Sequence, residues 1–269
     1  MTKQPVLFIV VPVYNERDNV LRLVDSFGSV VREFEPTFSV RFIVVDDGSH
    51  DGTAQSFERH RGSLAIAILR HTVNLGPGKA FATAFGSLSG EVRDIDYVTT
   101  IEGDNTSRLE LIRQMITRLA EGFDVVLASP YLYGGGIRQT NTYRIILSNI
   151  ANILVKEALG LRGIMTMSSF FRVYRGAAFC RLQEAFGVHI IERAGFESMV
   201  EMLFKMVFLG FRISEVAMVL DTSLRAGKSK MNVMRTAIGY LTLWKDKRRW
   251  MRLADLNRKS HTLEELAEA

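Results

Sequence analysis

The chain has 269 residues, 47% of them hydrophobic, which is enough to bury one large core or two modest ones. Its single cysteine, Cys180, excludes an intrachain disulfide, a cysteine-based zinc cluster and a redox pair, and it fits a reducing compartment. The longest run without a charged residue, 125–137, is too short for a transmembrane helix, and the amino-terminal residues lack the pattern of a signal peptide.

The net charge of +5 is unevenly distributed along the chain. Residues 225–259 contain eleven Lys and Arg against two Asp, a net charge of +9, so the remaining residues sum to −4. A basic carboxyl-terminal segment favours an anionic partner, and nucleic acid and anionic lipid are both compatible with it.

Predicted strands and helices alternate through the first half of the chain, which implies a mainly parallel sheet with right-handed crossovers. The expected strands are 6–13, 40–45, 64–69, 97–101 and 125–128. The expected helices are 16–34, one that begins within 51–59, 78–87 and 109–121.

The regular alternation of predicted strands and helices ends after Pro130. We expect a flexible loop at Gly134–Gly136, followed by helices at 141–159 and 196–209, strands at 170–173 and 212–219, and a last helix at 232–257. That last helix is apolar nearly all round in its first half and basic in its second half. The simplest division is one domain over 1–230 and a basic amphipathic helical tail over 231–269.

Carboxylates follow two of the expected strands directly. The first strand ends in Pro12, Tyr14 and Glu16, and the second in Asp46 and Asp47. A purely structural role is also open for Glu16, since its carboxylate could complement a helix dipole. Two successive acids at a strand end, however, repel each other unless a donor-rich ligand or a cation intervenes. We therefore expect Asp46 and Asp47 to bind a ligand, Tyr14 to pack against a base, and Glu16 to accept a hydrogen bond from a base or ribose.

A glycine-rich segment, 74–79, precedes the expected helix at 78–87. It is not a Walker A sequence, which requires Gly-x-x-x-x-Gly-Lys-Ser/Thr. It forms either a tight turn or a loop whose Lys79 contacts a nucleotide phosphate.

The strand at 97–101 ends in Glu102-Gly103-Asp104. Side chains two residues apart point to the same side of an extended chain, so Glu102 and Asp104 can bind one Mg²⁺ or Mn²⁺. Such a cation would neutralise a nucleoside diphosphate as it leaves. The alternative is a solvated loop.

Together these segments resemble the family 2 glycosyltransferases, which have a GT-A fold, a Rossmann-like α/β architecture. The resemblance runs from about Val6 to Lys230 and implies that the first two segments contact the nucleotide and that Glu102 and Asp104 hold the metal. The family's first metal ligand is an aspartate, where this chain has Glu102.

A narrower resemblance is to the dolichol-phosphate mannosyltransferase type of polyprenyl-phosphate glycosyltransferase. It is carried by landmarks that follow in order, namely Tyr131, Gly134–Gly136, Arg144, Ser148, Ser168–Arg175, Gly195–Glu197 and Gly227–Lys230. The chain departs from that group at Pro130, where arginine is common, and at Thr106, where a metal-ligating glutamine is common.

This narrower resemblance implies which residues bind phosphates. Arg144 and Ser148 are four residues apart, share a helix face, and would bind the acceptor lipid phosphate. Arg225, Lys228 and Lys230 would hold the donor phosphates. The expected reaction is inverting transfer of a hexose from GDP-mannose or UDP-glucose, with Asp104 and Arg144 as the catalytic residues.

The basic tail fits a lipid acceptor. We expect it to lie at a membrane interface with Trp244 and Trp250 at headgroup depth, which implies a cytoplasmic protein held peripherally at the inner face of a membrane. Packing on the domain or assembly as a homo-oligomer is the alternative for its apolar part.

Three other functions compete with this interpretation. A family 2 enzyme acting on a saccharide hydroxyl would need a base, for which Glu197 or Glu201 is the candidate. A nucleotidyltransferase would carry a glycine-rich, basic loop after the first strand, and the chain has none there. A nucleic-acid binder would leave the acids at the strand ends unexplained, since acids repel phosphates, so we expect no nucleic-acid partner.

Overall fold

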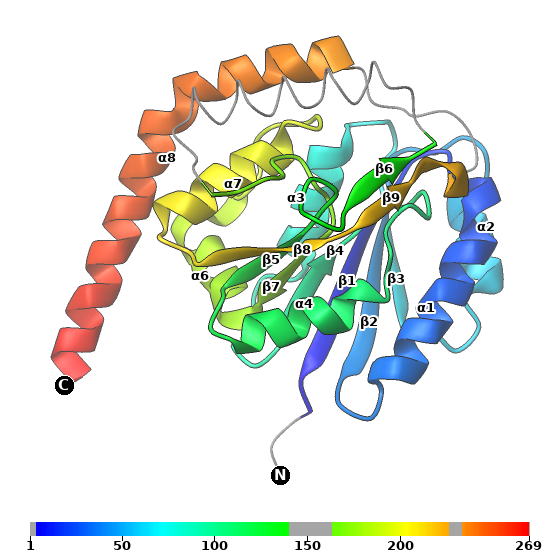
Figure 1. The fold of residues 1–269 in the computed structure, drawn as a ribbon, viewed down its shortest axis with the longest axis horizontal. Helices are drawn as coiled ribbons and strands as arrows, with labels where there is room; N and C mark the ends of the chain where they lie inside the picture. Colours follow the sequence, from blue (N-terminus) through cyan, green and yellow to red (C-terminus); the bar gives the residue numbers. More distant parts are fainter. Residues whose placement is uncertain (1–3, 140–162, 226–232, 269) are drawn as a thin grey trace.

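The continuous apolar run Val6–Val13 forms β1, an inner strand of a seven-stranded sheet in the computed structural model (Figure 1). The structure describes residues 4–139, 163–225 and 233–268. The sheet order is β3-β2-β1-β4-β7-β5-β8. The other strands of this sheet are β2 Ser39–Asp46, β3 Ile66–Arg70, β4 Tyr97–Thr100, β5 Val125–Ser129, β7 Arg172–Arg175 and β8 Ile213–Ala217.

All neighbouring strands are parallel except at β7, which runs antiparallel to both β4 and β5. The predicted mainly parallel sheet is confirmed. In register, Val13 of β1 lies opposite Asp46 of β2, and Val10 lies opposite Thr100 of β4. The carboxyl ends of these three strands therefore meet at one edge of the sheet.

Alternate side chains of β1 pack into two hydrophobic cores, one on each face of the sheet. Leu7, Ile9 and Val11 pack toward three helices, α1 Val20–Phe34, α2 Thr53–His60 and α4 Leu111–Ala120. Phe8 and Val10 pack toward α3 Pro77–Ser87, α6 Gly176–Phe186 and α7 Ser198–Phe208. Short 3-10 helices lie at Arg17–Asn19, Gly187–His189 and Thr222–Leu224.

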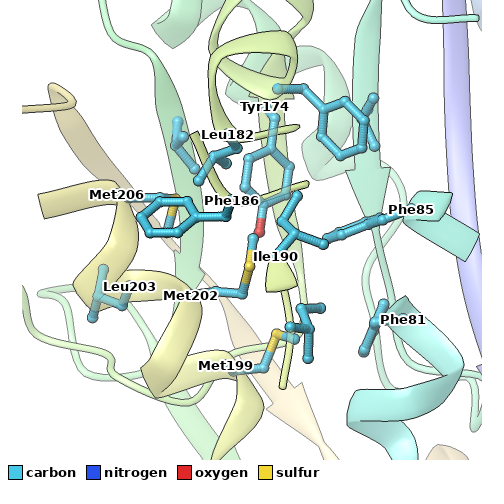
Figure 2. Packing of buried hydrophobic residues seen from close by; sticks show 14 of the residues in the cluster. Phe81, Phe85, Tyr174, Leu182, Phe186, Ile190, Met199, Met202, Leu203 and Met206 are labelled. Atoms are coloured by element: carbon cyan, nitrogen blue, oxygen red, sulfur yellow. The ribbon is translucent and has the colours of Figure 1, made fainter. Parts of the chain in front are cut away.

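The second of these cores is rich in aromatic and methionine side chains. Figure 2 shows Phe85 of α3, Tyr174 of β7 and Met202 of α7 converging within it. Phe85 meets Tyr174 edge to face at a centroid separation of 6.3 Å. This packing fixes α3 and α7 on the same side of the sheet.

Most predicted elements occur within a few residues of their expected bounds, but the last helix runs to Glu268 and does not end at 257. Helix α6 was not predicted. A second, two-stranded parallel sheet joins β6 Gly136–Arg138 to β9 Val219–Asp221, so the flexible loop expected at Gly134–Gly136 is wrong for Gly136. The helix predicted at 141–159 lies outside the described residues.

The carboxyl-terminal helix α8, Val233–Glu268, packs on α6 and α7 and then runs past the edge of the sheet domain (Figure 1). Leu243, Trp250 and Ala254 are fully buried in its contact with the domain. The expectation that Trp250 lies at headgroup depth is wrong, because its indole is buried and donates to Glu192 Oε2 at 2.7 Å. Trp244, by contrast, is 56% exposed. Among the described residues, no helix is both long enough and apolar enough to cross a membrane.

The carboxylate of Glu192 anchors α8, and its effect should depend on pH. Burial opposes its ionisation, but hydrogen bonds from Arg249 and Trp250 and the nearby Lys205 charge lower the pKa of Glu192 to about 2. A lowered pKa adds stability above the unfolded value near 4.5, and that stability is lost as the pH falls toward 2. We expect Glu192→Gln to reduce the free energy of unfolding by about 2 kcal/mol at pH 7. The difference from wild type should shrink between pH 5 and pH 3 in urea titrations. A difference that is constant with pH would contradict this role.

Candidate active site

The acidic turn after β4 sits directly against the end of β1. Ile101 continues the ladder, its N–H donating to Val10 O at 3.0 Å. Gly103 then passes so close to β1 that a Cβ added there would lie 2.6 Å from both Pro12 O and Val13 Cγ1. Glu102 and Asp104 are thereby held beside the segment that carries Tyr14 and Glu16.

This close approach makes Gly103 sensitive to a single methyl group. We expect Gly103→Ala to lower the free energy of unfolding by on the order of 1–3 kcal/mol and to weaken the predicted nucleotide binding, because the acidic turn must move away from β1. Gly86 is a matched control, since a Cβ there meets nothing within 4 Å. Gly86→Ala should stabilise α3 by about 0.5–1 kcal/mol. Denaturant titration and nucleoside-diphosphate binding measure both effects, and equal behaviour of the two variants would contradict the prediction.

The loops that follow β1 and β2 are tied together by hydrogen bonds. Asn15, in the left-handed region at φ 49°, donates its N–H to Ser49 Oγ at 2.8 Å and accepts from His50 N at 2.9 Å. The Glu16 N–H donates to Thr53 Oγ1 at 2.9 Å. Asn15 therefore links two loops, a role that its place after a strand did not predict.

The Glu16 carboxylate is buried and connects to the acidic turn through amides. It accepts a hydrogen bond from Asn19 Nδ2. Asn105, which directly follows Asp104, in turn donates to Asn19 Oδ1 at 3.0 Å. Tyr14 is half-buried at the start of the same loop. The predicted base-binding and metal-binding segments thus share one hydrogen-bonded network.

Asp46 and Asp47 are both buried, and each has partners within the protein. Asp46 Oδ1 accepts from Ser49 N at 3.0 Å. Asp47 accepts from the N–H groups of Leu75 at 2.9 Å and Gly76 at 2.8 Å, and it pairs with His71 Nδ1 at 2.7 Å. Asp47 therefore organises the loop that enters α3, and its binding of a ligand stays a prediction.

The glycine-rich loop before α3 rests on the backbone that precedes α7. Gly78 donates its N–H to Ala194 O at 2.8 Å, and a Cβ at Gly78 would lie 2.0 Å from Arg193 O. The segment is thus a tight turn in which glycine is required by close backbone approach. Lys79 lies in the first turn of α3 with an exposed side chain, and its contact with a phosphate stays a prediction.

Thr106 lies between the two acids of the turn. Its Oγ1 is 2.6 Å from Glu102 Oε2 and 2.6 Å from Asp104 Oδ1, and its side chain is fully buried. One hydroxyl carries one proton, so it can donate to only one of these oxygens. The second short contact requires a further proton or a cation.

The electrostatics of the turn agree with this geometry. Burial, followed by the adjacent negative charge of Asp104, raises the pKa of Glu102 to about 7. Glu102 is therefore readily protonated in the protein without a bound cation.

Arg225 supplies the positive charge that faces this turn. Its Nε donates to Asp104 Oδ2 at 2.5 Å, across 121 residues of sequence, and its Nη2 lies 2.5 Å from the same oxygen. An arginine expected to hold donor phosphates is here paired with a predicted metal ligand. Its contact with phosphate stays a prediction.

The donor set of the turn fits a hard divalent cation. Two carboxylates and a hydroxyl are oxygen ligands of the kind that Mg²⁺ and Mn²⁺ take. The two acids lie on either side of the Thr106 hydroxyl, and a bound cation would offset the repulsion between their negative charges. In the described parts of the chain, no group of three or more His, Cys, Asp or Glu side chains could hold a metal. A cation at Glu102 and Asp104 would therefore complete its shell with water or phosphate oxygens.

The remaining predicted residues divide into two groups. Arg144, Ser148, Lys228 and Lys230 lie outside the described residues. Glu201, a candidate base for a hydroxyl acceptor, is fully buried and paired with Lys205 Nζ at 2.5 Å, so it is unsuited to that role. Glu197 packs under α8, where a Cβ at Gly239 would lie 3.0 Å from its Cδ.

Sequence reasoning missed two contributors to this region. His71 bridges Asp47 and Thr83 Oγ1, the latter at 2.9 Å, and the backbone at Ala194 supports the glycine-rich loop. His71 follows β3 directly, so its place at a strand end could have indicated it.

A family model described as "Glycosyl transferase family 2" matches residues 8–182. The polyprenol monophosphomannose synthase of Mycolicibacterium smegmatis is 26% identical over 230 residues, covering 83% of this chain and 80% of that protein. The undecaprenyl-phosphate mannosyltransferase of Micrococcus luteus is 25% identical over 244 residues, covering 90% and 94%.

Solved structures resemble the fold at lower identity. Glucosyl-3-phosphoglycerate synthase from Mycobacterium tuberculosis, in complex with Mn²⁺, UDP and glucosyl-3-phosphoglycerate, has a TM-score of 0.60 at 18% identity, covering 88% of this chain and 78% of that one. A mannosyltransferase from Pyrobaculum calidifontis in complex with GDP-Man and Mn²⁺ has a TM-score of 0.50 at 15% identity, covering 97% and 76%. At these identities the likeness concerns the fold alone.

Proposed function

Because this chain belongs to glycosyltransferase family 2 and has the expected GT-A type of sheet, we propose that it transfers a hexose from a nucleotide-diphosphate sugar to a polyprenyl phosphate. The observation that carries the proposal is the cluster of Glu102, Asp104 and Arg225 at the same sheet edge as Tyr14 and Glu16. Relatives named for transfer to polyprenol, dolichol-phosphate and undecaprenyl-phosphate support the acceptor class.

The donor would lie across the ends of β1, β2 and β4. Tyr14 would pack against the base, while Pro12, Glu16, Asp46 and Asp47 would line the nucleoside site. Lys79, Arg225, Lys228 and Lys230 supply positive charge for the diphosphate. A cation held by Glu102 and Asp104 would neutralise charge on the departing diphosphate. GDP-mannose and UDP-glucose are the candidate donors.

The acceptor phosphate attacks the anomeric carbon from the face opposite the diphosphate. The carbon–oxygen bond to the diphosphate breaks with its electron pair, and a new bond to the acceptor oxygen forms, so the configuration inverts. A phosphate monoester has a second pKa of about 6 and is already ionised at neutral pH, so no strong general base is required. Arg144 and Ser148 would position this phosphate.

The burial of Glu201 supports a phosphate acceptor over a saccharide hydroxyl. A hydroxyl acceptor needs a base at the site, whereas Glu201 is fully buried with Lys205. The Glu197 side chain packs beneath Gly239 of α8 and accepts a hydrogen bond from Gly195 N at 3.3 Å.

Product analysis tests the acceptor. The full chain, incubated with Mn²⁺, labelled GDP-mannose or UDP-glucose, and undecaprenyl phosphate, should form a labelled lipid that mild acid cleaves. A label that resists mild acid, or one that enters only saccharides, would overturn the proposal in favour of glycosidic-bond synthesis.

Peripheral contact with the cytoplasmic face of a membrane is part of the same proposal. The outer face of α8 exposes Trp244 at 56% and Met251 at 42%, with Lys245, Arg248 and Arg252 exposed around them. An aromatic residue flanked by basic residues is suited to the headgroup region of anionic lipid. Removal of residues 231–269 would also strip Trp250 from the core, so a full-length variant is the better test.

Flotation with vesicles containing anionic lipid measures this contact. Wild type should float with the vesicles, and a variant combining Trp244→Ala, Arg248→Gln and Arg252→Gln should remain at the bottom. Arg32→Gln with Arg59→Gln is a charge control, since both arginines are exposed on other helices. Equal recovery of wild type and the α8 variant would contradict membrane contact through this face.

A further inference from the structure

The ion pair between Arg225 and Asp104 has an unusual arrangement. The guanidinium Nε donates to Asp104 Oδ2 at 2.5 Å, and Nη2 lies 2.5 Å from the same oxygen. The two side chains are only 20% and 12% exposed. Charge-assisted hydrogen bonds of this kind, largely removed from solvent, are stronger than ion pairs on the surface.

The backbone that leads to Arg225 is held from two directions. Strand β9 pairs with β6, and just beyond it Thr222 Oγ1 donates to Gln139 O at 2.7 Å. Arg22 of α1 donates through Nη1 to Leu224 O at 2.8 Å. The backbone that precedes Arg225 is therefore held in place, and the Arg225 side chain extends from it to Asp104.

The oxygens of Asp104 are then fully engaged. Oδ1 accepts from Thr106 N at 3.1 Å and lies 2.6 Å from Thr106 Oγ1, while Oδ2 accepts from Arg225 Nε and lies 2.5 Å from Arg225 Nη2. A divalent cation ligated by Asp104 must compete with the guanidinium for Oδ2 and meets its positive charge at short range. Arg225 and the cation are therefore competing partners of one carboxylate.

A diphosphate offers Arg225 an alternative partner. The guanidinium fork matches two phosphate oxygens, and a nucleoside diphosphate brings several negative charges to the same sheet edge. A ligand that releases Arg225 from Asp104 also frees the carboxylate for the cation. Each of the two ligands then removes an obstacle to the binding of the other.

Resting on the proposed function, we propose that Arg225 is the resident counter-ion of Asp104 in the ligand-free protein and exchanges onto the donor diphosphate. Mn²⁺ alone then binds weakly, and Mn²⁺ and the nucleotide bind cooperatively. The arginine thereby restricts tight cation binding to the state in which a nucleotide diphosphate is present.

Manganese titrations of the full chain, followed by the electron paramagnetic resonance of free Mn²⁺, test this exchange. In wild type, saturating GDP or UDP should tighten Mn²⁺ binding by at least about tenfold. Arg225→Gln should bind Mn²⁺ alone at least about fivefold more tightly than wild type, and its coupling to nucleotide should be smaller than that of wild type. Arg225→Met, which keeps the aliphatic length, provides a second test of the same outcome.

Arg108→Gln is the matched control, because it removes the same charge from the segment just after Asp104 and is half exposed. It should retain the wild-type values. If Arg225→Gln and Arg225→Met, both folded by circular dichroism, bind Mn²⁺ alone no more tightly than wild type, the exchange is overturned and the proposed transfer stands. If no protein binds Mn²⁺ with or without nucleotide while transfer continues in chelator, the metal site itself is overturned.

Discussion

Asp104→Asn is expected to reduce hexose transfer by about a thousandfold or more while leaving the fold intact. Asparagine has the same shape and still offers an oxygen to Thr106 N, which donates to Asp104 Oδ1 at 3.1 Å. It lacks the charge that a cation and Arg225 both require. Loss of several kcal/mol of transition-state stabilisation corresponds to a rate loss of this size, since each 1.36 kcal/mol is tenfold.

The measurement is the initial rate of labelled lipid formation, with thermal unfolding as the check on folding. Glu110→Gln is the matched control, because it removes one negative charge from the same loop at a side chain that is 75% exposed. Its rate should equal that of wild type. Full activity of Asp104→Asn in excess chelator would show that the carboxylate holds no essential cation.

Glu201→Ala is expected to lower the free energy of unfolding by about 3–5 kcal/mol. Glu201 of α7 pairs with Lys205 at 2.5 Å, and both side chains are fully buried. Its carboxylate also accepts from the N–H groups of Glu192, at 2.9 Å, and Arg193, at 2.8 Å. Alanine would leave a buried ammonium and two buried N–H groups without this acceptor.

Lys205→Met should be less damaging than Glu201→Ala. The Glu201 carboxylate would keep its backbone donors at Glu192 and Arg193 after the lysine is removed. Urea titration of both variants measures the order, with Glu110→Ala as an exposed control expected to change stability by less than about 0.5 kcal/mol. A loss below 1 kcal/mol for Glu201→Ala, or the reverse order of the two variants, would contradict this account.

The consequence of Glu201→Ala should extend beyond stability. The segment that Glu201 holds also carries Glu192, which anchors Trp250 of α8, and Ala194 O, which accepts from Gly78 N. Hydrogen exchange should therefore rise in α8 and in the loop before α3 together. A rise of hydrogen exchange confined to α7 would contradict the prediction that Glu201 supports α8 and the loop before α3.

Much of this protein was predictable because local patterns report burial and chain direction. The run Val6–Val13 is apolar on both faces, as an inner strand of a parallel sheet requires. Acids that directly follow such strands must reach the sheet edge, so the proximity of Glu102 and Asp104 to the end of β1 followed from their positions in the chain. Most helices followed from the 3.6-residue periodicity in the same way, although α6 was missed and α8 runs to Glu268, beyond the predicted end at 257.

Partner choice between distant residues was decided only by the tertiary structure. The sequence marked Arg225 as basic, Trp250 as amphipathic and Asp47 as an acid at a strand end. It did not indicate that Arg225 pairs with Asp104 across 121 residues, that Trp250 is buried against Glu192, or that Asp47 holds the loop before α3. The reason is physical: periodicity along the chain reports which face of a helix or strand is apolar, whereas the partner of an individual side chain is whatever the folded backbone brings within contact distance.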